Sequence, residues 1–375
     1  MEANRFEAIG FNRDKLQAWM LENQVDGVFL TSPENVFYST GYPCLPSSGN
    51  PIVYALRNML PFYSFFGKDG KVTLLCWMMA SFGAEYSIDD SRTFFTYPMA
   101  IDTLTDFIKE NIKAGGVIAV ESTCPYILIK ILDENAKPSR LVIVDDQINR
   151  MRMIKSEEEI KRIQKSTQII DRTVRELAGI LKVGMSRLEL IDEAKWRLLK
   201  NGAHAVDHVT VAFGLANPEI ALGEILEPDQ IVTLDLGGIY EGYASDNRKL
   251  AYTGKVPEEM RALHQKLCDI VSQVGNGLQP GKKFSEMHAL AASLYAKYGL
   301  EPYFLHAGHS IGLQVDEAWM LSDNETLIEE NMVFNIELYG HHDSGVMIGN
   351  EETYLVTSHG PEKLSSLPPD IIEVA

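Results

Sequence analysis

The stretch IVTLDLGGIYEGYASDNRKLAYTG, residues 231–254, reads as two apolar strands joined by a tight Glu-Gly turn. One strand contains Asp235 and the other contains Asp246. A two-residue loop at this turn pairs Asp235 with Arg248 and Asp246 with Gly237. Side chains alternate between the two faces of a strand, so the aspartates share one face as diagonal neighbours, about 7 to 8 Å apart at the backbone. The hairpin therefore predicts two adjacent carboxylates among residues suited to burial.

The composition restricts the class of protein. The 375 residues suit two domains, and 45% hydrophobic with 23% charged residues is typical of a soluble globular chain. A net charge of −18 without a basic run argues against nucleic acid or an anionic membrane as a partner. The N-terminus lacks the apolar segment of a signal peptide, and apolar stretches such as VTLLCWMMASFGA are too short to span a bilayer, so we expect a cytoplasmic protein.

The pattern of expected strands and helices changes near residue 150. Before that point, strand-like runs such as GVFLTS and KVTLLCW alternate with helical ones such as RDKLQAWMLENQ, which is typical of an α/β domain. After it, Lys155–Leu181 has the periodicity of one long amphipathic helix, opened by a capping box of Ser156 and Glu159. We therefore place two domains at 1–150 and 151–375.

The second domain contains an internal repeat. The segment LKVGMSRLELIDEAKWRLLKNGA, from Leu181, aligns with LQPGKKFSEMHALAASLYAKYGL, from Leu278, at a constant offset of 97 residues with five identities over 23 positions. Each copy follows an amphipathic helix and precedes a strand-rich segment. The second domain is therefore predicted to consist of two similar α+β halves, an arrangement that often places a ligand site between the halves.

The second half contains acidic residues that match the aspartates of the hairpin. Glu337 lies inside the apolar strand NMVFNIELYG, and Glu351 is expected at the head of the strand in GVMIGNEETYLVT. His309 lies between glycines in HAGHSIGL, where the backbone can approach a site closely. On an exposed surface such carboxylates would be harmless, but four of them in one core require cations. Oxygen-rich donors with one imidazole suit Mn, Co, Fe or Zn, and four carboxylates can bridge two ions.

The order of these residues resembles that of the prolidase, aminopeptidase P and methionine aminopeptidase superfamily of the pita-bread fold. The shared pattern is an aspartate, a second aspartate eleven residues later, GHSIGL, FNIE and a glutamate before TYLVT. SPENVFYSTGY resembles the N-terminal domain of creatinases and prolidases, and RMIKSEEEIKRI resembles the start of their catalytic domain. The resemblance implies a pita-bread catalytic domain of α+β class, preceded by a smaller α/β creatinase-like domain, and a homodimer.

The resemblance also implies the metal ligands. Carried over by position, the expected ligands of two divalent ions are Asp235, Asp246, His309, Glu337 and Glu351. Manganese is the first choice of metal. Glu352 is an adjacent rival to Glu351, but counting back from TYLVT favours Glu351.

Three departures from the family pattern concern the substrate. The chain reads GLQVDE where proline-directed relatives usually read GLEVHE, so Asp316 stands at the position of a substrate-binding imidazole. Met347 replaces an arginine of GVRIED, with two further residues inserted before Glu351. The histidine of an ALPH-like phrase is absent from NPEIALGEILEP. These differences bear on Xaa-Pro specificity more than on the metal site.

Three other side chains are candidates for binding or proton transfer. His208 falls on an expected pocket-lining strand and is assigned substrate or proton-transfer chemistry, while His306 can line the pocket and Tyr339 can donate a hydrogen bond to substrate. Structural roles are the alternative for each of them. Asp316 is expected to meet a cationic or amide group of the substrate.

These observations lead to a hypothesis and two alternatives. The chain is expected to be a dinuclear-metal hydrolase that cleaves a C–N bond in a small peptide or amide, most simply as an Xaa-Pro dipeptidase or aminopeptidase, with Glu337 moving the proton to the leaving nitrogen. A hydrolase or lyase of the same fold that acts on a small non-peptide metabolite is the first alternative. A non-catalytic scaffold is the second.

Overall fold

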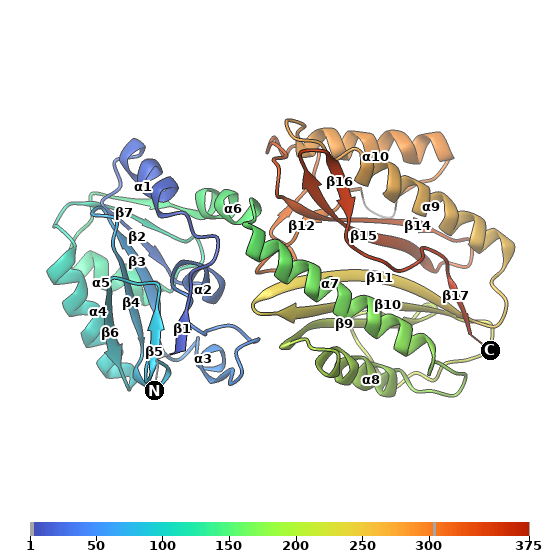
Figure 1. The fold of residues 1–375 in the computed structure, drawn as a ribbon, viewed down its shortest axis with the longest axis horizontal. Coiled ribbons are helices and arrows are strands. Elements are labelled where there is room, and N and C mark those ends of the chain that lie inside the picture. The colour runs from blue at the N-terminus through green and yellow to red at the C-terminus, as the bar shows by residue number, and fades with distance from the viewer. Residues whose placement is uncertain (1–3, 303–304, 375) are drawn as a thin grey trace. The chain divides into compact units, whose positions relative to one another are not determined.

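The computed structural model describes residues 4–302 and 305–374, which divide into two compact units between Arg152 and Met153 (Figure 1). The division falls two residues after the boundary expected from the sequence. The first unit is an α/β domain, and the second has an α+β architecture, as predicted.

The first unit is built on one mixed sheet of six strands in the order β6-β4-β3-β2-β7-β8. The central pairs β2–β3 and β3–β4 are antiparallel, whereas β2–β7, β7–β8 and β4–β6 are parallel. The predicted strand runs GVFLTS and KVTLLCW coincide with β2 and β4. The bounds are β2 Gly27–Leu30, β3 Tyr63–Gly67, β4 Val72–Trp77, β6 Asp90–Phe94, β7 Val117–Val120 and β8 Arg140–Ile143, with a separate parallel pair of β1 Asn4–Phe6 and β5 Ala84–Tyr86.

Helices cover this sheet and complete its core. In α4 the buried side chains Leu104, Phe107 and Ile108 recur at three- and four-residue spacing, so they form one face that packs into the core. The helices are α1 Arg13–Glu22, α2 Pro33–Thr40, α3 Ile52–Ala55, α4 Tyr97–Asn111, α5 Tyr126–Asn135 and α6 Asp145–Met153, and a 3₁₀ turn spans Met78–Ala80.

The second unit begins with the long helix α7, Glu157–Ala178. Its start is fixed by the predicted capping box, in which the Ser156 hydroxyl accepts from the Glu159 N–H and the Glu159 carboxylate accepts from the Ser156 N–H. The other helices are α8 Arg187–Lys200, α9 Glu258–Asn276 and α10 Phe284–Tyr298. Figure 1 shows α7 and α8 on one sheet and α9 and α10 beside the other.

The predicted repeat is visible in corresponding local structures. Helices α8 and α10 begin 97 residues apart, and each follows a glycine with positive φ, Gly184 at 87° and Gly281 at 90°. The N–H of Gly184 donates to Leu226 O, and that of Gly281 donates to Ile328 O. The two halves therefore share the same entry into their second helix.

Each half contributes one sheet. The first has the strand order β17-β11-β10-β9 and the second has the order β13-β12-β14-β15-β16. The bounds are β9 Ala205–Phe213, β10 Ile231–Tyr240, β11 Tyr243–Thr253, β12 His309–Ser310, β13 Ala318–Trp319, β14 Val333–His341, β15 Met347–Thr357, β16 Gly360–Lys363 and β17 Ile372–Val374. The sheets approach each other along β11 and β15, where the Thr353 hydroxyl of β15 donates to Asp246 O at 3.4 Å, and the Asn335 amide of β14 donates to the same oxygen at 3.1 Å.

The hairpin of β10 and β11 has the register that the two-residue turn predicts. Asp235 pairs with Arg248, and Asp246 pairs with Gly237. Glu241 and Gly242 both have positive φ, 47° and 93°, as a turn between twisted strands requires. The turn thus fixes the relative positions of the two aspartates.

The position of Glu351 within its strand differs from the expectation. Glu351 was expected at the head of a strand, but β15 begins four residues earlier, at Met347, and Glu351 pairs with Glu337 of β14. The cause is the antiparallel partner: β14 extends to His341, so its backbone groups pair with the segment around Gly349 despite the low strand propensity of glycine.

No helix within residues 4–302 and 305–374 combines the length and the apolar character needed to cross a bilayer.

Candidate metal centre

The hairpin and its neighbour β9 supply the first part of the site. Asp235 and Asp246 are both 7% exposed, and His208 of β9 reaches them from the adjacent strand. His208 Nε2 lies 3.4 Å from Asp235 Oδ1 and 3.2 Å from Asp246 Oδ1, while its Nδ1 lies 3.0 Å from Asp207 Oδ2. Gly237 leaves room for this ring, because a Cβ there would lie 2.3 Å from His208 Nδ1.

The second half supplies the other part. Glu337 on β14 and Glu351 on β15 are cross-strand partners, and Glu351 Oε1 accepts from the Asn335 amide at 2.7 Å. His309 on β12 is 1% exposed, and its Nε2 lies 4.0 Å from Asp246 Oδ2. The preceding Gly308 has φ of 121°, and a Cβ there would lie 1.9 Å from Asn335 O. Only glycine therefore permits this approach of the two strands.

The structure brings all five expected ligands into one region. Possible ligand atoms of His208, Asp235 and Asp246 lie within 4.8 Å of one another, and so do those of Asp246, His309 and Glu351. Asp246 is common to both groups. Glu337 joins the region through its pairing with Glu351 and through Arg248, whose Nη2 lies 3.7 Å from Glu337 Oε1.

Glu352 points elsewhere. Its carboxylate accepts from Lys249 Nζ at 2.8 Å and from the hydroxyl of Ser365, on the opposite face of β15. Side chains alternate along a strand, so only one of the adjacent glutamates can face the cluster. The structure brings Glu351 there, and Glu352 forms a buried ion pair instead.

Arg248 is a member of the cluster that the sequence reasoning missed. It follows Asp246 by two residues on β11 and is therefore on the same face. Its guanidinium forms an ion pair with Asp235 and lies over the ring of Tyr339, 4.5 Å from the centroid. The predicted hairpin register already set Arg248 opposite Asp235, so the signal was present but was not used.

The electrostatics of the cluster show an excess of buried negative charge. Burial raises the pKa of Glu337 to about 8; Arg248 opposes this rise, whereas Asp235 and Asp246 add to it. Burial, with repulsion from Asp246 and Glu337, raises the pKa of Glu351 well above its usual value. Burial also favours a raised pKa for Asp235, but Arg248 holds that pKa below its ordinary value. A further cation would relieve the repulsion among the remaining carboxylates.

The donor atoms fit a divalent ion. Asp246 Oδ1 and Glu351 Oε2 are buried without a hydrogen-bond partner in the described part of the chain. Asp246 Oδ1 is close to His208 Nε2, but no hydrogen bond joins them. Buried carboxylate oxygens rarely remain unpaired in a folded protein, and a bound ion is one partner that satisfies them. With His309 Nε2 they provide an oxygen-rich set with one imidazole, which suits Mn, Co, Fe or Zn.

The three residues expected to contact substrate lie around this cluster in different settings. Asp316 Oδ1 lies 3.2 Å from His309 Nδ1, and 46% of the Asp316 side chain is exposed. His306 Nδ1 accepts from the N–H of Gly308 at 3.0 Å, and its ring packs edge-on against Trp319. Tyr339 is buried beneath Arg248. Of the three, Asp316 alone is substantially open to solvent.

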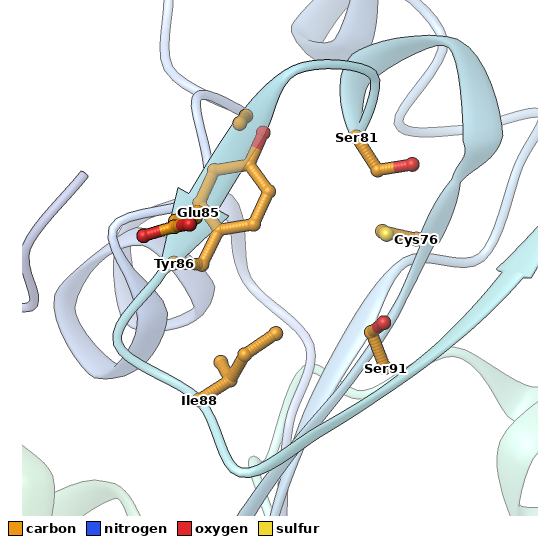
Figure 2. A pocket seen from close by; sticks show the side chains of 7 residues that line it. Cys76, Ser81, Glu85, Tyr86, Ile88 and Ser91 are labelled. Carbon is orange, nitrogen blue, oxygen red and sulfur yellow. The ribbon is translucent and has the colours of Figure 1, made fainter. Parts of the chain in front are cut away.

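A separate hollow lies in the first unit. Figure 2 shows side chains from β4, β5 and β6 around it, and its volume is about 410 Å³. Burial raises the pKa of the Cys76 thiol in its wall to about 12, so this cysteine is a poor nucleophile. The lining residues are Cys76, Ser81, Ala84, Glu85, Tyr86, Ile88 and Ser91. With one carboxylate and no imidazole, this lining offers no metal-binding set comparable to that of the second unit.

Comparison with known proteins agrees with this geometry. Residues 161–358 match Metallopeptidase family M24, and residues 12–154 match the Creatinase/Prolidase N-terminal domain. The chain is 27% identical over 368 residues to the Xaa-Pro dipeptidase of Pyrococcus furiosus, covering 96% of this chain and 99% of that protein. It is 28% identical over 366 residues to the Xaa-Pro dipeptidase of Pyrococcus horikoshii, covering 96% and 97%.

Solved structures show the same fold. The prolidase from Pyrococcus horikoshii superimposes with a TM-score of 0.82 at 24% identity, covering 95% of this chain and 98% of that one. The predicted pita-bread fold with its N-terminal domain is therefore confirmed. The match to family M24 spans more than half of the chain and includes all five expected ligands. The chain belongs to metallopeptidase family M24, a family of metal-dependent hydrolases, and carries a creatinase/prolidase-type N-terminal domain.

Proposed function

We propose that the chain hydrolyses the C–N bond of short peptides, with Xaa-Pro dipeptides as the first substrate class, in a reaction that requires a divalent metal ion. The observation that carries this proposal is the convergence of Asp246, His309 and Glu351, with two buried carboxylate oxygens that have no hydrogen-bond partner among the described residues. The Xaa-Pro dipeptidases at 27% and 28% identity support the substrate class. At least one of the two ions expected from the sequence would be held by these three side chains.

The proposed chemistry divides between the ion and the protein. A bound divalent ion supplies a Lewis acid that polarises the scissile carbonyl and favours ionisation of the attacking water. Glu337, beside Glu351 on the neighbouring strand, accepts the proton of that water and passes it to the leaving nitrogen. His208, whose side chain is 26% exposed, provides a second proton-transfer group next to Asp235 and Asp246.

The proposed substrate contacts follow from how far each candidate side chain is exposed to solvent. Asp316 presents its free oxygen to solvent and favours a substrate with a cationic or amide group nearby. Tyr339 and His306 are 3% and 2% exposed, so they would form the floor of the site. The ring of Tyr339 would also hold the Arg248 guanidinium, which lies over it, at that floor.

An activity panel tests the proposal. The purified chain, supplied with Mn²⁺, is assayed on Xaa-Pro dipeptides, Xaa-Pro-Yaa tripeptides and matched Xaa-Ala dipeptides, before and after chelation. We expect turnover of Xaa-Pro dipeptides that chelation abolishes and Mn²⁺ restores. Turnover of tripeptides alone would indicate an aminopeptidase. Bound metal without any peptide turnover favours the small non-peptide metabolite, and a chain that takes up no metal favours the non-catalytic scaffold.

Manganese, a homodimer and a cytoplasmic location complete the proposal. Manganese is supported by the oxygen-rich donor set, while the dimer rests on the resemblance to the family and the location on the composition of the chain. Metal analysis of protein purified without added metal and light scattering of the same sample test the first two.

A further inference from the structure

Arg248 is enclosed by the same residues that form the candidate metal centre. It is 7% exposed, its guanidinium forms an ion pair with Asp235, and Nη2 lies 3.7 Å from Glu337 Oε1. The guanidinium also lies over the ring of Tyr339, 4.5 Å from its centroid. An arginine keeps its charge in proteins, so this cluster contains one permanent positive charge contributed by the chain itself.

The carboxylates of the cluster fall into two sets according to their partners. Both oxygens of Asp235 are engaged, Oδ2 by Arg248 and Oδ1 by His208 Nε2 at 3.4 Å. Asp246 Oδ1 lies 3.2 Å from the same His208 Nε2 without the angles of a hydrogen bond, and Glu351 Oε2 has no hydrogen-bond partner within residues 4–302 and 305–374. The two aspartates share the imidazole of His208, but the ion pair with Arg248 balances the Asp235 side alone, and the open oxygen of Glu351 lies on the side formed by Asp246, His309 and Glu351.

We propose that Arg248 replaces the second metal ion, so that the chain binds one divalent ion, at Asp246, His309 and Glu351. This inference rests on the metal dependence of the proposed function and refines the number of ions. A divalent ion bound to Asp235 would have to displace the guanidinium or share a buried carboxylate with it, and both cations would repel each other across a short distance. The guanidinium, held by Asp235 and by the ring of Tyr339, has no alternative carboxylate among its described contacts except Glu337.

Metal stoichiometry tests the inference without reference to activity. The full-length chain, Arg248→Met and the matched control Arg162→Met are saturated with Mn²⁺, desalted and analysed by elemental mass spectrometry, and titrated by calorimetry. Methionine keeps an unbranched apolar side chain over Tyr339 and removes the charge. Arg162 is a suitable control because it also lies over a tyrosine, Tyr243, and pairs with glutamates, yet it contacts no expected ligand.

We expect one Mn²⁺ per chain for the wild type and for Arg162→Met, and two for Arg248→Met. Two ions in the wild type would overturn the inference, as would a single ion in folded Arg248→Met. A wild type that binds none would overturn both this inference and the proposed metal dependence. Failure of the peptide assay with one ion bound would affect the proposed substrate alone.

Electron paramagnetic resonance of the wild type provides a second measurement that does not depend on the variant being folded. An isolated Mn²⁺ ion at saturation supports the inference, and a spin-coupled pair of ions overturns it. Circular dichroism of each variant identifies any loss of fold before the stoichiometries are compared.

Discussion

Asp316 Oδ1 lies 3.2 Å from His309 Nδ1, so the carboxylate faces the ring nitrogen that points away from Asp246. Such a partner fixes the tautomer of a metal-binding histidine and increases the basicity of its other nitrogen. We expect Asp316→Ala to weaken Mn²⁺ binding by about 10- to 100-fold, measured by calorimetry. Asp323→Ala, at an exposed residue of the following loop, is the control and should leave the affinity unchanged. Equal affinities for both variants would contradict a positioning role for Asp316.

Glu337 is expected to carry the proton in the proposed reaction. Glu337→Gln retains a carbonyl oxygen but cannot accept a proton, so kcat for the best dipeptide should fall by about 10²- to 10⁴-fold. Metal content, measured on the same sample, distinguishes loss of proton transfer from loss of the ion. Glu329→Gln, an exposed residue just before the same strand, should behave as wild type. Unchanged kcat with metal bound would exclude Glu337 as the proton carrier.

Substitutions of the two adjacent glutamates on β15, Glu351 and Glu352, are expected to have different effects. Glu351→Gln should reduce Mn²⁺ binding sharply, because Glu351 faces Asp246 and His309. Glu352→Gln should retain the ion but lower the free energy of unfolding by about 3 to 5 kcal/mol, since it leaves Lys249 buried without its charged partner. Elemental analysis and urea denaturation of both variants test this assignment. The reverse pattern would mean that the ligand was assigned to the wrong glutamate.

Gly308 holds His309 against β14. Gly308→Ala would place a Cβ 1.9 Å from Asn335 O and would also strain a backbone with φ of 121°. Gly281→Ala, at a φ of 90° with nothing within 4 Å of its Cβ, is strained in the backbone alone. We expect a loss of about 1 kcal/mol in unfolding free energy for Gly281→Ala and at least about 3 kcal/mol for Gly308→Ala. Similar losses in the two urea denaturation curves would show that the close approach is not needed.

His264 of α9 makes stability depend on pH outside the metal centre. Burial lowers its pKa from 6.5 to about 4, with Lys249 and Arg261 adding to the effect and Asp370 opposing it. Between these values the unfolded chain binds more protons than the folded chain, so this contribution to stability is full above pH 6.5 and is lost as the pH falls towards 4. The loss is at most about 3 kcal/mol.

The matched variant for this prediction is His264→Gln, which does not titrate. Denaturation at several pH values should give wild type and variant curves whose difference shrinks on acidification. Parallel curves would mean that His264 does not contribute to acid sensitivity. Cys268 Sγ lies 3.7 Å from both imidazole nitrogens. The experiment must therefore keep this thiol from reacting with reagents in solution.

The hairpin shows which features could be predicted from the sequence. A two-residue turn fixes the register, so the pairing of Asp235 with Arg248 and of Asp246 with Gly237 followed from the position of the Glu-Gly dipeptide. The repeat similarly predicted two halves with corresponding helices. The capping box of Ser156 correctly marked the start of α7. Local rules of this kind succeed where a short segment determines its own geometry.

Other features depend on distant parts of the chain. The start of β15 was placed too late because Gly349 and Asn350 have low strand propensity, and the pairing with β14 outweighs this. The approach of Asp316 to His309 depends on the loop between β12 and β13, whose path no pattern in GLQVDE indicates. Arg248 was visible as a cross-strand partner, but its position among four carboxylates required the second half of the domain.

The contribution of both halves to one cluster has a consequence for synthesis of the protein. Asp235 and Asp246 leave the ribosome long before Glu351, which follows Asp246 by 105 residues. A nascent chain that ends within β14 lacks one of the donors grouped around Asp246 and cannot hold the ion as the finished protein does. Such a hydrolase would stay inert during translation and acquire its reactivity only when the last strands dock.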